Sequence, residues 1–570
     1  MSAPWRIVRT DEERVERLAR ELSVSDTLAR ILVLRGFTTE EEAARFLRKS
    51  MVDLKGPFEL AGMDRAAERV AHALANSEKI LVHGDFDADG ITATALLTLF
   101  LRSLGGAVTP FVPNRLVEGH GISPKAIEAA QREHAALVIT CDCGISSHQE
   151  VAALRALGID TIVTDHHAVP AQTPADAILV NPKLEENGTE QAELSGVGVA
   201  FMLVVAVRSR LRDTGFFADR QEPNLKDYLD IVALGTLADL APVRGQNRIL
   251  VAHGLERIAA SRRPGLAAMR ETAGLAQNAS IQADDVGFRL APRINAAARL
   301  GHADEALELL LTADPSRAAE LARSVETWNS ERKALQERMV RVARIEAERQ
   351  VREGRRAVVV ASPDFHVGVI GLVAQKLAEI YARPAFVFAV GGETSRGSGR
   401  SAGAIDLIAA MEDCRDLFLA FGGHREAGGG TVESRRLGEF ETRFERAATR
   451  QGPNAVQEVL IDAELKLRQL SEEILCSLEQ LRPFGVGNRT PLFLARARVV
   501  GGAREVGKGH LRVGLSDPEG SHTFSAVGFG MWKPAHGDLK GLCEIAYSPE
   551  FNVWEGRKGI QLRLKGIRSV

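Results

Sequence analysis

The first half of the chain alternates short apolar runs with longer segments of helical periodicity. The run ILVHG, which starts at Ile80, is followed by a segment of helical length that ends at Gly105-Gly106. ALVITCDCG, DTIVTDHH and AILVNP continue the pattern, separated by a helical segment and a Pro-rich stretch. Apolar runs separated by helices of about 10 to 15 residues indicate βαβ units on a parallel sheet. The sequence therefore predicts an α/β domain with a parallel sheet over residues 61–305.

A long segment with little glycine follows Gly301. Its helical periodicity continues to Arg355, which predicts a connecting helix over residues 306–355, interrupted near Asp314-Pro315. The strand-like runs RAVVVAS and AFVFAV then enclose another helical segment. Residues 356–450 are therefore expected to form a second, smaller α/β domain.

The two ends of the chain differ from this α/β pattern. From about Ala455 onward, short alternating runs separated by Gly and Asp turns predict a small β-barrel over residues 451–570, and its last part contains Trp532, Tyr547 and Trp554. Residues 1–60 are expected to form a loose helical arm. No window approaches about 18 uninterrupted apolar residues, and the first 20 residues lack the apolar core of a signal peptide, so a cytoplasmic location without a membrane span is expected.

Composition narrows the possible functions. The 570 residues include 72 Lys and Arg against 75 Asp and Glu, a formal net charge of -3. This balance excludes a uniformly basic protein that wraps nucleic acid, although a local basic groove is compatible with it. The five cysteines contain only one close pair, which supports neither a disulfide framework nor a four-thiolate zinc site.

An acidic motif stands where the first predicted strand passes into a helix. The segment HGDFDADG places His83 and three aspartates at alternate positions, Asp85, Asp87 and Asp89. Carboxylates this close repel one another and raise each other's pKa unless a cation is present. A divalent metal is the simplest resolution. The alternative is an Asp-rich turn in which Asp89 caps the helix.

Two further strand ends carry the same chemistry. Asp142 ends the run ALVITCDCG, and Asp165, His166 and His167 end the run DTIVTDHH, while Asp239 follows the apolar segment DIVALGTLAD. A lone acid is commonly a helix cap and a histidine pair is commonly a surface feature, but three successive strand ends of this kind favour a metal site. Oxygen and imidazole ligands without thiolate favour Mn²⁺ or Mg²⁺. The seven candidate ligands exceed the needs of one ion and predict two ions that share a carboxylate: His83, Asp85, Asp87, Asp89, Asp142, His166 and Asp239.

These four motifs, in this order, resemble those of the DHH phosphoesterase superfamily. The resemblance implies that Asp142 bridges two metal ions and that His166 and Asp239 complete the second site. It also implies that His167 lies near the scissile phosphate and that Asp165 supports the histidines from behind. The assignment of the three motif-one acids to individual ions stays open.

The rest of the chain is similar to one family of that superfamily, the single-strand-specific exonucleases called RecJ. The similarity rests on APRINAAARL, HVGVIGLVAQKL, GSGRS, FGGHREAGG, RPFGVGN and the terminal barrel, which looks like the family's OB-fold. Ala298 replaces the more usual glycine of the first motif, which affects close packing rather than chemistry. The resemblance implies that the second α/β domain is the DHH-associated domain. It also implies that Arg115, Ser398 and Arg400 surround the DNA 5′ end and that Arg293 and Arg299 approach the strand.

Two of these motifs can also be interpreted from their residues alone. The segment GSGRS offers hydroxyls, flexible backbone N–H groups and the Arg400 guanidinium, a combination suited to gripping a terminal phosphate; the alternative is a mobile Gly/Ser loop. Gly422-Gly423-His424 lets the backbone approach a ligand closely and presents one imidazole, or else forms a tight structural turn.

The expected function is hydrolysis of single-stranded DNA in the 5′→3′ direction to mononucleotides by two Mn²⁺ or Mg²⁺ ions, with the aromatic residues of the barrel stacking on the strand. The enzyme alternative is a DHH phosphoesterase for short oligonucleotides, cyclic dinucleotides or pyrophosphate. A DNA-binding scaffold without catalysis predicts a decayed acid set, whereas every motif position is filled here. The resemblance further implies a monomer with single-strand-binding protein and a RecQ-type helicase as partners, in recombination and mismatch repair.

Overall fold

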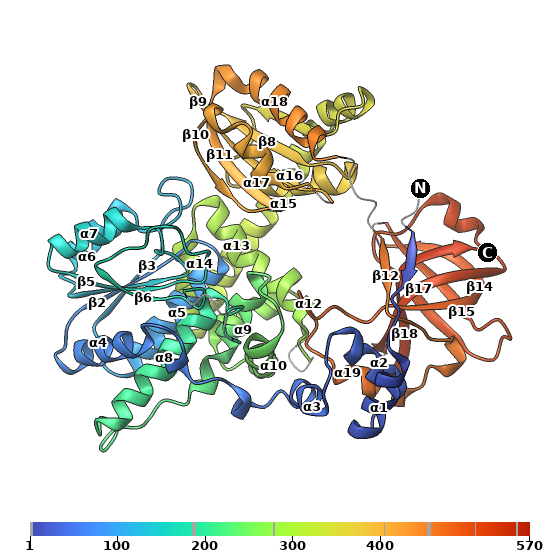
Figure 1. Ribbon diagram of the computed structural model, residues 1–570, viewed down its shortest axis with the longest axis horizontal. Helices are drawn as coiled ribbons and strands as arrows, with labels where there is room; N and C mark the ends of the chain where they lie inside the picture. Colours follow the sequence, from blue (N-terminus) through green and yellow to red (C-terminus); the bar gives the residue numbers. More distant parts are fainter. Residues whose placement is uncertain are drawn as a thin grey trace. The chain divides into compact units, whose positions relative to one another are not determined.

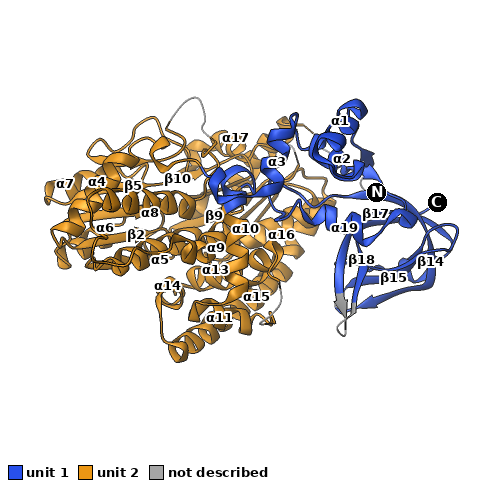
Figure 2. Ribbon diagram, turned by 90° about the horizontal axis from the view of Figure 1, so that it is seen from below, with its two compact units in different colours: residues 1–54, 242–249, 457–570 blue, residues 55–241, 250–456 orange. Residues whose placement is uncertain are grey.

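The protein divides into two compact units (Figure 2). The computed structural model describes residues 4–184, 190–276, 280–403, 405–452, 458–507, 509–554 and 557–570; the side chain of Trp554 lies outside its description. Unit 1 comprises residues 1–54, 242–249 and 457–570, and unit 2 comprises residues 55–241 and 250–456. The five domain ranges drawn from the sequence stay predictions, because both α/β domains fall in one unit here.

Unit 2 begins with a five-stranded parallel sheet of order β3-β2-β4-β5-β6 (Figure 1). The strands are β2 (Ile80–Gly84), β3 (Val108–Phe111), β4 (Leu137–Cys141), β5 (Asp160–Thr164) and β6 (Ala177–Val180). The helices of this region are α4 (Met63–Ala75), α5 (Ala88–Ser103), α6 (Pro124–Arg132), α7 (His148–Ala156), α8 (Gly196–Asp213) and α9 (Leu229–Ala238). The predicted parallel sheet is confirmed.

Helices cover both faces of this sheet, which explains the continuous apolar runs in its strands. Helices α6 and α7 pack on one face, and α4, α5 and α8 pack on the other (Figure 1). Strands β2 and β4 are buried over their whole length. The carboxyl ends of β2, β4 and β5 therefore meet at one edge, and polar side chains that follow these strands are brought together there.

A helical region follows the first sheet. Its elements are α10 (Gly245–Ala260), α11 (Pro264–Thr272), α12 (Ala283–Asp285), a π-helical turn (Val286–Leu290), α13 (Ala291–Leu300), α14 (Ala303–Leu311) and α15 (Pro315–Arg352). The predicted break is confirmed, because Asp314 caps α15 through a 2.9 Å hydrogen bond from the Ser316 N–H and Pro315 takes the first helical position. No helix in the described ranges is long and apolar enough to cross a membrane.

The second sheet of unit 2 is mixed and has the order β10-β11-β9-β8-β7. Its strands are β7 (Val358–Ser362), β8 (Ala385–Val390), β9 (Thr394–Arg400), β10 (Phe418–Gly423) and β11 (Ala427–Glu433), and its helices are α16 (Ile370–Tyr381), α17 (Leu407–Glu412) and α18 (Leu437–Arg450). The first four residues of GSGRS, Gly397 to Arg400, lie within β9, which is paired on both sides. The alternative of a mobile Gly/Ser loop is therefore wrong for Gly397 to Arg400, and so is the expectation of flexible backbone N–H groups there, since these groups belong to sheet ladders.

The barrel of unit 1 is closed by five strands. Its sheet runs β13-β14-β15-β16-β18-β17, and an additional β14–β17 pairing closes it, as predicted. The strands are β13 (Ala463–Glu464), β14 (Phe493–Val506), β15 (His510–Ser516), β16 (Thr523–Gly528), β17 (Leu542–Trp554) and β18 (Arg557–Ser569), with helix α19 (Glu472–Glu479) beside them. Tyr547 is fully buried and donates a 2.6 Å hydrogen bond to the Leu465 carbonyl, so it is a core residue and does not serve the predicted stacking.

The N-terminal segment belongs to the same unit. Strand β1 (Trp5–Ile7) pairs in parallel with β12 (Val459–Ile461), and helices α1 (Glu12–Leu22), α2 (Asp26–Leu34) and α3 (Glu40–Arg48) follow it. Leu18, Leu28 and Leu32 pack in one core with Phe493 and Tyr547 of the barrel. The helical character is confirmed, but the arm is not loose, because burying its apolar faces against the barrel stabilises both.

Candidate metal centre and anion cavity

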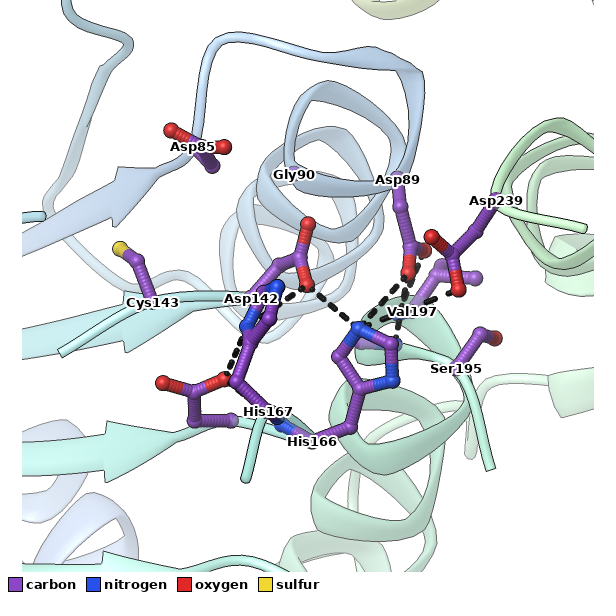
Figure 3. Close-up of polar contacts among 12 residues, drawn as sticks. Asp85, Asp89, Gly90, Asp142, Cys143, His166, His167, Ser195, Val197 and Asp239 are labelled. Atoms are coloured by element: carbon purple, nitrogen blue, oxygen red, sulfur yellow. Dashed lines mark hydrogen bonds and ion pairs between the residues drawn. The ribbon is translucent and has the colours of Figure 1, made fainter. Parts of the chain in front are cut away.

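The acidic and histidine motifs converge at one edge of the parallel sheet (Figure 3). Asp85 follows β2 and Asp142 follows β4, while Asp165, His166 and His167 follow β5. Asp87 caps α5, with its Oδ1 accepting from the N–H groups of Asp89 and Gly90 at 2.9 and 3.2 Å. Asp239 ends helix α9. The structure thus gathers residues that lie up to about 150 positions apart in the chain.

His166 lies at the middle of the cluster. Its Nε2 atom is 3.0 Å from Asp142 Oδ1 and 3.9 Å from carboxylate oxygens of both Asp89 and Asp239 (Figure 3). Three overlapping groups have ligand atoms within 4.8 Å of one another: Asp142 with His166 and His167; Asp89 with His166 and Asp239; Asp85 with Asp87 and Asp142. Asp142 belongs to two of these groups, which is the arrangement that a shared carboxylate requires.

Several buried polar atoms of the cluster lack a hydrogen-bond partner, and these atoms indicate a ligand. They include Asp85 Oδ1, Asp142 Oδ1 and His83 Nε2. His83 Nδ1 lies 2.8 Å from the Gly84 carbonyl, which can only accept, so Nδ1 carries the proton and Nε2 presents a lone pair. His83 is nevertheless outside the three close groups. Its predicted role as a ligand stays a prediction.

The electrostatics of the carboxylates favour a bound cation. Burial, and then repulsion by Asp89, raises the pKa of Asp142 well above its usual range. Burial and repulsion by Asp239 do the same for the pKa of Asp89, and burial followed by repulsion from Asp87 raises the pKa of Asp239 to about 7. A divalent cation removes both causes, because it compensates lost hydration and neutralises the repelling charges. Carboxylate and imidazole ligands fit Mn²⁺ or Mg²⁺.

Asp165 holds the histidine pair through hydrogen bonds from both residues. It accepts hydrogen bonds from His167 Nδ1 at 2.8 Å and from the Ile145 N–H at 3.0 Å. Although burial raises the pKa of Asp165, the hydrogen bonds from His167 and Ile145 lower it to about 2. Asp165 is therefore ionised, and its contact with Nδ1 directs the Nε2 atom of His167 away from it.

A cavity of about 840 Å³ lies next to this cluster in unit 2, and we call it the anion cavity. Four arginines line it, Arg115, Arg299, Arg396 and Arg400, together with His120 and Ser398. No Asp or Glu of the described residues is among its lining. The pKa of Arg299 is lowered to about 9 by burial and by the neighbouring Arg115 and Arg400 guanidinium groups. A bound anion would relieve this repulsion.

The strand β9 places the predicted phosphate-binding residues on one face. Ser398 and Arg400 line the cavity, whereas a Cβ atom on Gly397 would lie 2.4 Å from the Phe388 ring on the other face. Arg400 Nη1 donates to Ser398 Oγ at 3.1 Å and to the Gly399 carbonyl at 2.7 Å. The alternation of a strand, rather than a flexible loop, therefore aims the hydroxyl and the guanidinium at the same space.

Two residues join the cavity to the acidic cluster. The Arg115 guanidinium lies 4.7 Å from the centre of the Phe86 ring, and Phe86 stands between Asp85 and Asp87 in the sequence. His120 Nδ1 lies 3.2 Å from Asp85 Oδ2, and the hydrogen bond with Asp85 raises the pKa of His120 to about 9. Sequence reasoning missed His120, and it also missed Arg396, whose Nη1 donates to the Leu116 carbonyl at 3.3 Å. The flanking glycines of the tripeptide Gly-His-Gly were the available signal for His120.

Two predicted DNA-binding residues do not reach the cavity. Arg293 is 7% exposed, and its guanidinium pairs with Glu326 at 2.6 Å and donates to the Arg289 and Thr272 carbonyls. His424 lies in the turn between β10 and β11 and is not among the cavity-lining residues. Arg293 satisfies carbonyl groups between packed helices, and His424 lies exposed in its turn. Their predicted contacts with DNA stay predictions.

Comparisons with known proteins agree with this architecture. Family models match in three places: the "DHH family, N-terminal domain" over residues 79–236, the "DHHA1 domain" over 354–450 and the "RecJ OB domain" over 461–566. The single-stranded-DNA-specific exonuclease RecJ of Salmonella typhimurium is 36% identical over 559 residues, which cover 95% of both chains. RecJ of Bacillus subtilis is 34% identical and is covered over 70% of its length, and 98% of this chain is covered.

Solved structures show the same fold with cations. RecJ of Thermus thermophilus in complex with Mn²⁺ aligns with a TM-score of 0.84 at 34% identity, over 100% of this chain and 80% of that chain. The Mg²⁺ complex aligns with a TM-score of 0.78 at 32% identity, over 100% and 78%. Together with the acid and imidazole groups described here, these structures identify Mn²⁺ or Mg²⁺ as the cofactor class.

Proposed function

Because the chain belongs to the RecJ family of single-stranded-DNA-specific exonucleases, we propose that it removes 5′-mononucleotides from single-stranded DNA in the 5′→3′ direction. One observation carries the proposal: the anion cavity with its four arginines adjoins the cluster of aspartates and histidines. A terminal phosphate fits the first and a scissile phosphate fits the second. An enzyme with both sites side by side acts at a phosphorylated end.

Two cations are proposed, held by overlapping ligand sets. Asp85, Asp87 and Asp142 would hold one, and Asp89, His166 and Asp239 would hold the other. Asp142 would be shared, since its Oδ1 lies 3.0 Å from His166 Nε2. When bound, the cations would supply Lewis acidity, which eases deprotonation of a water and offsets the charge that develops on the phosphate. The N–H groups of Gly196 and Val197, 2.7 and 2.9 Å from the Asp89 carboxylate, hold that ligand in place.

His167 acts on the reacting phosphate in this proposal. Its side chain is 46% exposed, while that of its partner Asp165 is 1% exposed. The hydrogen bond from Nδ1 to Asp165 fixes the ring and, although burial lowers the pKa of His167, raises that pKa above its usual value. The protonated ring would then donate from Nε2 to a phosphate oxygen. Asp165 is then a positioning residue that does not touch the substrate.

The 5′→3′ direction of degradation follows from the site that would hold the terminal phosphate, which we call the 5′-phosphate grip. Arg115, Ser398 and Arg400 would bind the 5′-phosphate, and the first nucleotide would fill the 840 Å³ cavity. The linkage after the first nucleotide would then reach the metal centre, so each cycle would release one 5′-mononucleotide. The barrel of unit 1, which matches the RecJ OB domain, is proposed to bind the following single strand.

The direct test compares labelled single strands in the presence of Mn²⁺. A 5′-labelled strand should lose its label as mononucleotide at once, whereas a 3′-labelled strand should shorten gradually. Mononucleotides from the 3′ end first, or equal cleavage of blunt duplex, would overturn the proposal. Faster turnover of a dinucleotide or a cyclic dinucleotide than of a long strand would favour the alternative of a small-substrate phosphoesterase. The Asp142→Asn variant serves as the inactive control.

Further parts of the proposal rest on the family resemblance. They are a monomeric enzyme in the cytoplasm, roles in DNA recombination and repair, and single-strand-binding protein and a RecQ-type helicase as partners. Sedimentation of the purified chain with and without single-strand-binding protein tests two of these points. Co-sedimentation in the absence of DNA is expected, and independent sedimentation of the two proteins would contradict the partnership.

A further inference from the structure

The loop after β3 presents a histidine between two glycines. Gly119 and Gly121 have φ values of 78° and 91°, a backbone region that side chains with a Cβ atom rarely adopt. Glu118 fixes the loop, because its Oε1 accepts from the Asn114 N–H at 2.9 Å and its Oε2 accepts from Ser123 Oγ at 2.6 Å. His120 is therefore held in one place by a constrained backbone.

The ring of His120 contacts the acidic cluster on one side. Its Nδ1 atom lies 3.2 Å from Asp85 Oδ2, and its ring centre lies 5.3 Å from that of His167 in an edge-to-face arrangement. Within the described part of the chain, His120 belongs to none of the three groups that could hold a metal ion. His120 is therefore a hydrogen-bond partner of the Asp85 carboxylate rather than an additional metal ligand.

The other side of the ring is open to the anion cavity. His120 is among the cavity-lining residues together with Arg115 and Ser398. Its side chain is 48% exposed, whereas that of Asp85 is 6% exposed. The exposed edge of the ring therefore lies between the cavity and Asp85.

We propose that His120 is a further substrate-contacting residue, which braces Asp85 through Nδ1 and donates a hydrogen bond through its other nitrogen to the phosphate that joins the first two nucleotides. This inference rests on the proposed function, since it takes the first nucleotide to lie in the anion cavity. The phosphate after that nucleotide then lies between the cavity and the metal centre, where the ring stands. The contact would align the scissile phosphate and would belong to neither the 5′-phosphate grip nor the metal ligands.

The test uses the Mn²⁺-loaded full chain and the variants His120→Ala and His120→Gln. With 5′-phosphorylated single strands, His120→Ala should lower kcat/KM by about 10- to 100-fold, as expected for loss of a hydrogen bond to a charged group. His120→Gln keeps a donor and should restore part of the loss. His72→Ala, an exposed histidine on α4, is the matched control and should behave like the wild type.

Inhibition by uncleavable oligonucleotides distinguishes a direct contact between His120 and the phosphate from a purely structural role of His120. One inhibitor carries a neutral methylphosphonate at the first linkage, and the other carries an anionic methylenephosphonate there. The wild type should bind the anionic inhibitor more tightly, and His120→Ala should reduce that preference by about tenfold. A purely structural role would weaken both inhibitors equally and would overturn the proposal.

The affinity for Mn²⁺ shows whether His120 is itself a metal ligand. Calorimetric titration with Mn²⁺ in the absence of DNA should give His120→Ala an affinity within about threefold of the wild type, since a metal ligand would cost 10-fold or more. A large loss of Mn²⁺ affinity would make His120 a ligand and overturn the proposal. A wild type that releases no 5′-mononucleotides would instead overturn the proposed function.

Discussion

The Nε2 atom of His166 lies 3.0 Å from the Oδ1 atom of Asp142, and the Nδ1 atom of His167 lies 3.9 Å from the same oxygen. Asp142 belongs to two of the three potential ligand groups, so its carboxylate links them. The backbone of Asp142 has φ 62°, in the left-handed region that asparagine and aspartate tolerate better than most residues. Strand β4 thus ends in a conformation that turns this carboxylate toward the histidine.

The first prediction concerns Asp142→Asn, which keeps the size and the tolerated backbone conformation. Turnover should be abolished, because the amide cannot bridge two cations. The melting temperature without metal should be equal to or above that of the wild type, since the variant removes a buried, mutually repelling charge. Differential scanning calorimetry and the 5′-label assay measure the two effects. Asp213→Asn, an exposed acid at the end of α8, is the control, and retention of most activity by Asp142→Asn would contradict the bridging role.

The second prediction concerns a glycine that is not a ligand. A Cβ atom on Gly196, the first residue of α8, would lie 2.6 Å from Asp142 Oδ1, and the Gly196 N–H donates to Asp89. Gly196→Ala should displace both carboxylates and lower Mn²⁺ affinity by about 10- to 100-fold, as changes around metal ligands commonly do. The control is Gly438→Ala, also in the first turn of a helix, where a Cβ atom meets nothing within 4 Å. Equal Mn²⁺ affinity of the two variants, measured by calorimetry, would show that α8 does not constrain the ligands.

Much of the metal centre could be predicted from the sequence, because most of its candidate ligands directly follow the ends of predicted strands. In a parallel sheet the residues after β2, β4 and β5 must meet at one edge, so Asp142 and His166 could be placed together from apolar runs alone. The anion cavity was harder to predict. It needs β9 of the second sheet to face residues such as Arg115 and His120, and no local periodicity encodes that pairing.

The roles of single side chains also depend on packing that the sequence does not reveal. Arg293 and Arg299 lie six positions apart in one motif, yet Arg293 is paired with Glu326 and Arg299 lines the cavity. Tyr547 belongs to the barrel core because its hydroxyl finds the Leu465 carbonyl. In each case a buried partner from a distant segment decides the role of the residue, and the motif alone does not name that partner.

The third prediction tests the 5′-phosphate grip. Arg400→Met keeps the apolar stem of the side chain and removes the guanidinium that contacts Ser398 Oγ. The KM for 5′-phosphorylated strands should rise by about 10- to 100-fold, and the preference for a 5′-phosphate over a 5′-hydroxyl should largely disappear. Steady-state kinetics on the two substrates give both values. Arg435→Met, whose side chain is 82% exposed in the same sheet domain, should leave them unchanged. A variant that keeps the full phosphate preference would move the grip elsewhere.

The fourth prediction concerns the pH dependence of metal binding. Burial and repulsion by Asp87 raise the pKa of Asp239 to about 7, and burial and neighbouring carboxylates hold the pKa of Asp142 well above its usual range. Burial lowers the pKa of His166 to about 3, so this ring stays neutral above pH 5 and does not compete. As pH falls from 8 to 6, protons occupy the carboxylates and Mn²⁺ must displace them. Affinity should therefore fall with decreasing pH, by up to about tenfold per unit for each proton displaced.

Calorimetry in two buffers of different ionisation enthalpy measures this linkage directly. Mn²⁺ binding should release protons near pH 6.5, and the release should decline toward pH 8.5. An affinity that is constant between pH 6 and 8, without proton release, would show that the carboxylates are already ionised in the metal-free protein.

The last prediction concerns the stability of unit 1. Arg248, only 2% exposed, donates to the carbonyls of Leu481, Pro483, Gln480 and Phe46 at 2.8 to 3.3 Å, and its guanidinium lies 3.7 Å from the centre of the Phe46 ring. It thereby joins α3, the segment after α19 and residues 242–249 in one core. Arg248→Met should leave these carbonyls unsatisfied and lower the free energy of unfolding of unit 1 by about 2 to 5 kcal/mol.

Arg248→Lys sharpens this test. An ammonium group lacks the planar fork of donors that reaches several carbonyls at once, so lysine should recover only part of the loss although it keeps the charge. The measurement is urea unfolding followed by the fluorescence of Trp5 and Trp532, both in unit 1, with the exposed Arg504→Met as control. Mn²⁺ affinity should be unchanged in both variants, because every proposed ligand lies in unit 2. Full stability of Arg248→Lys would contradict the role of the planar donor fork.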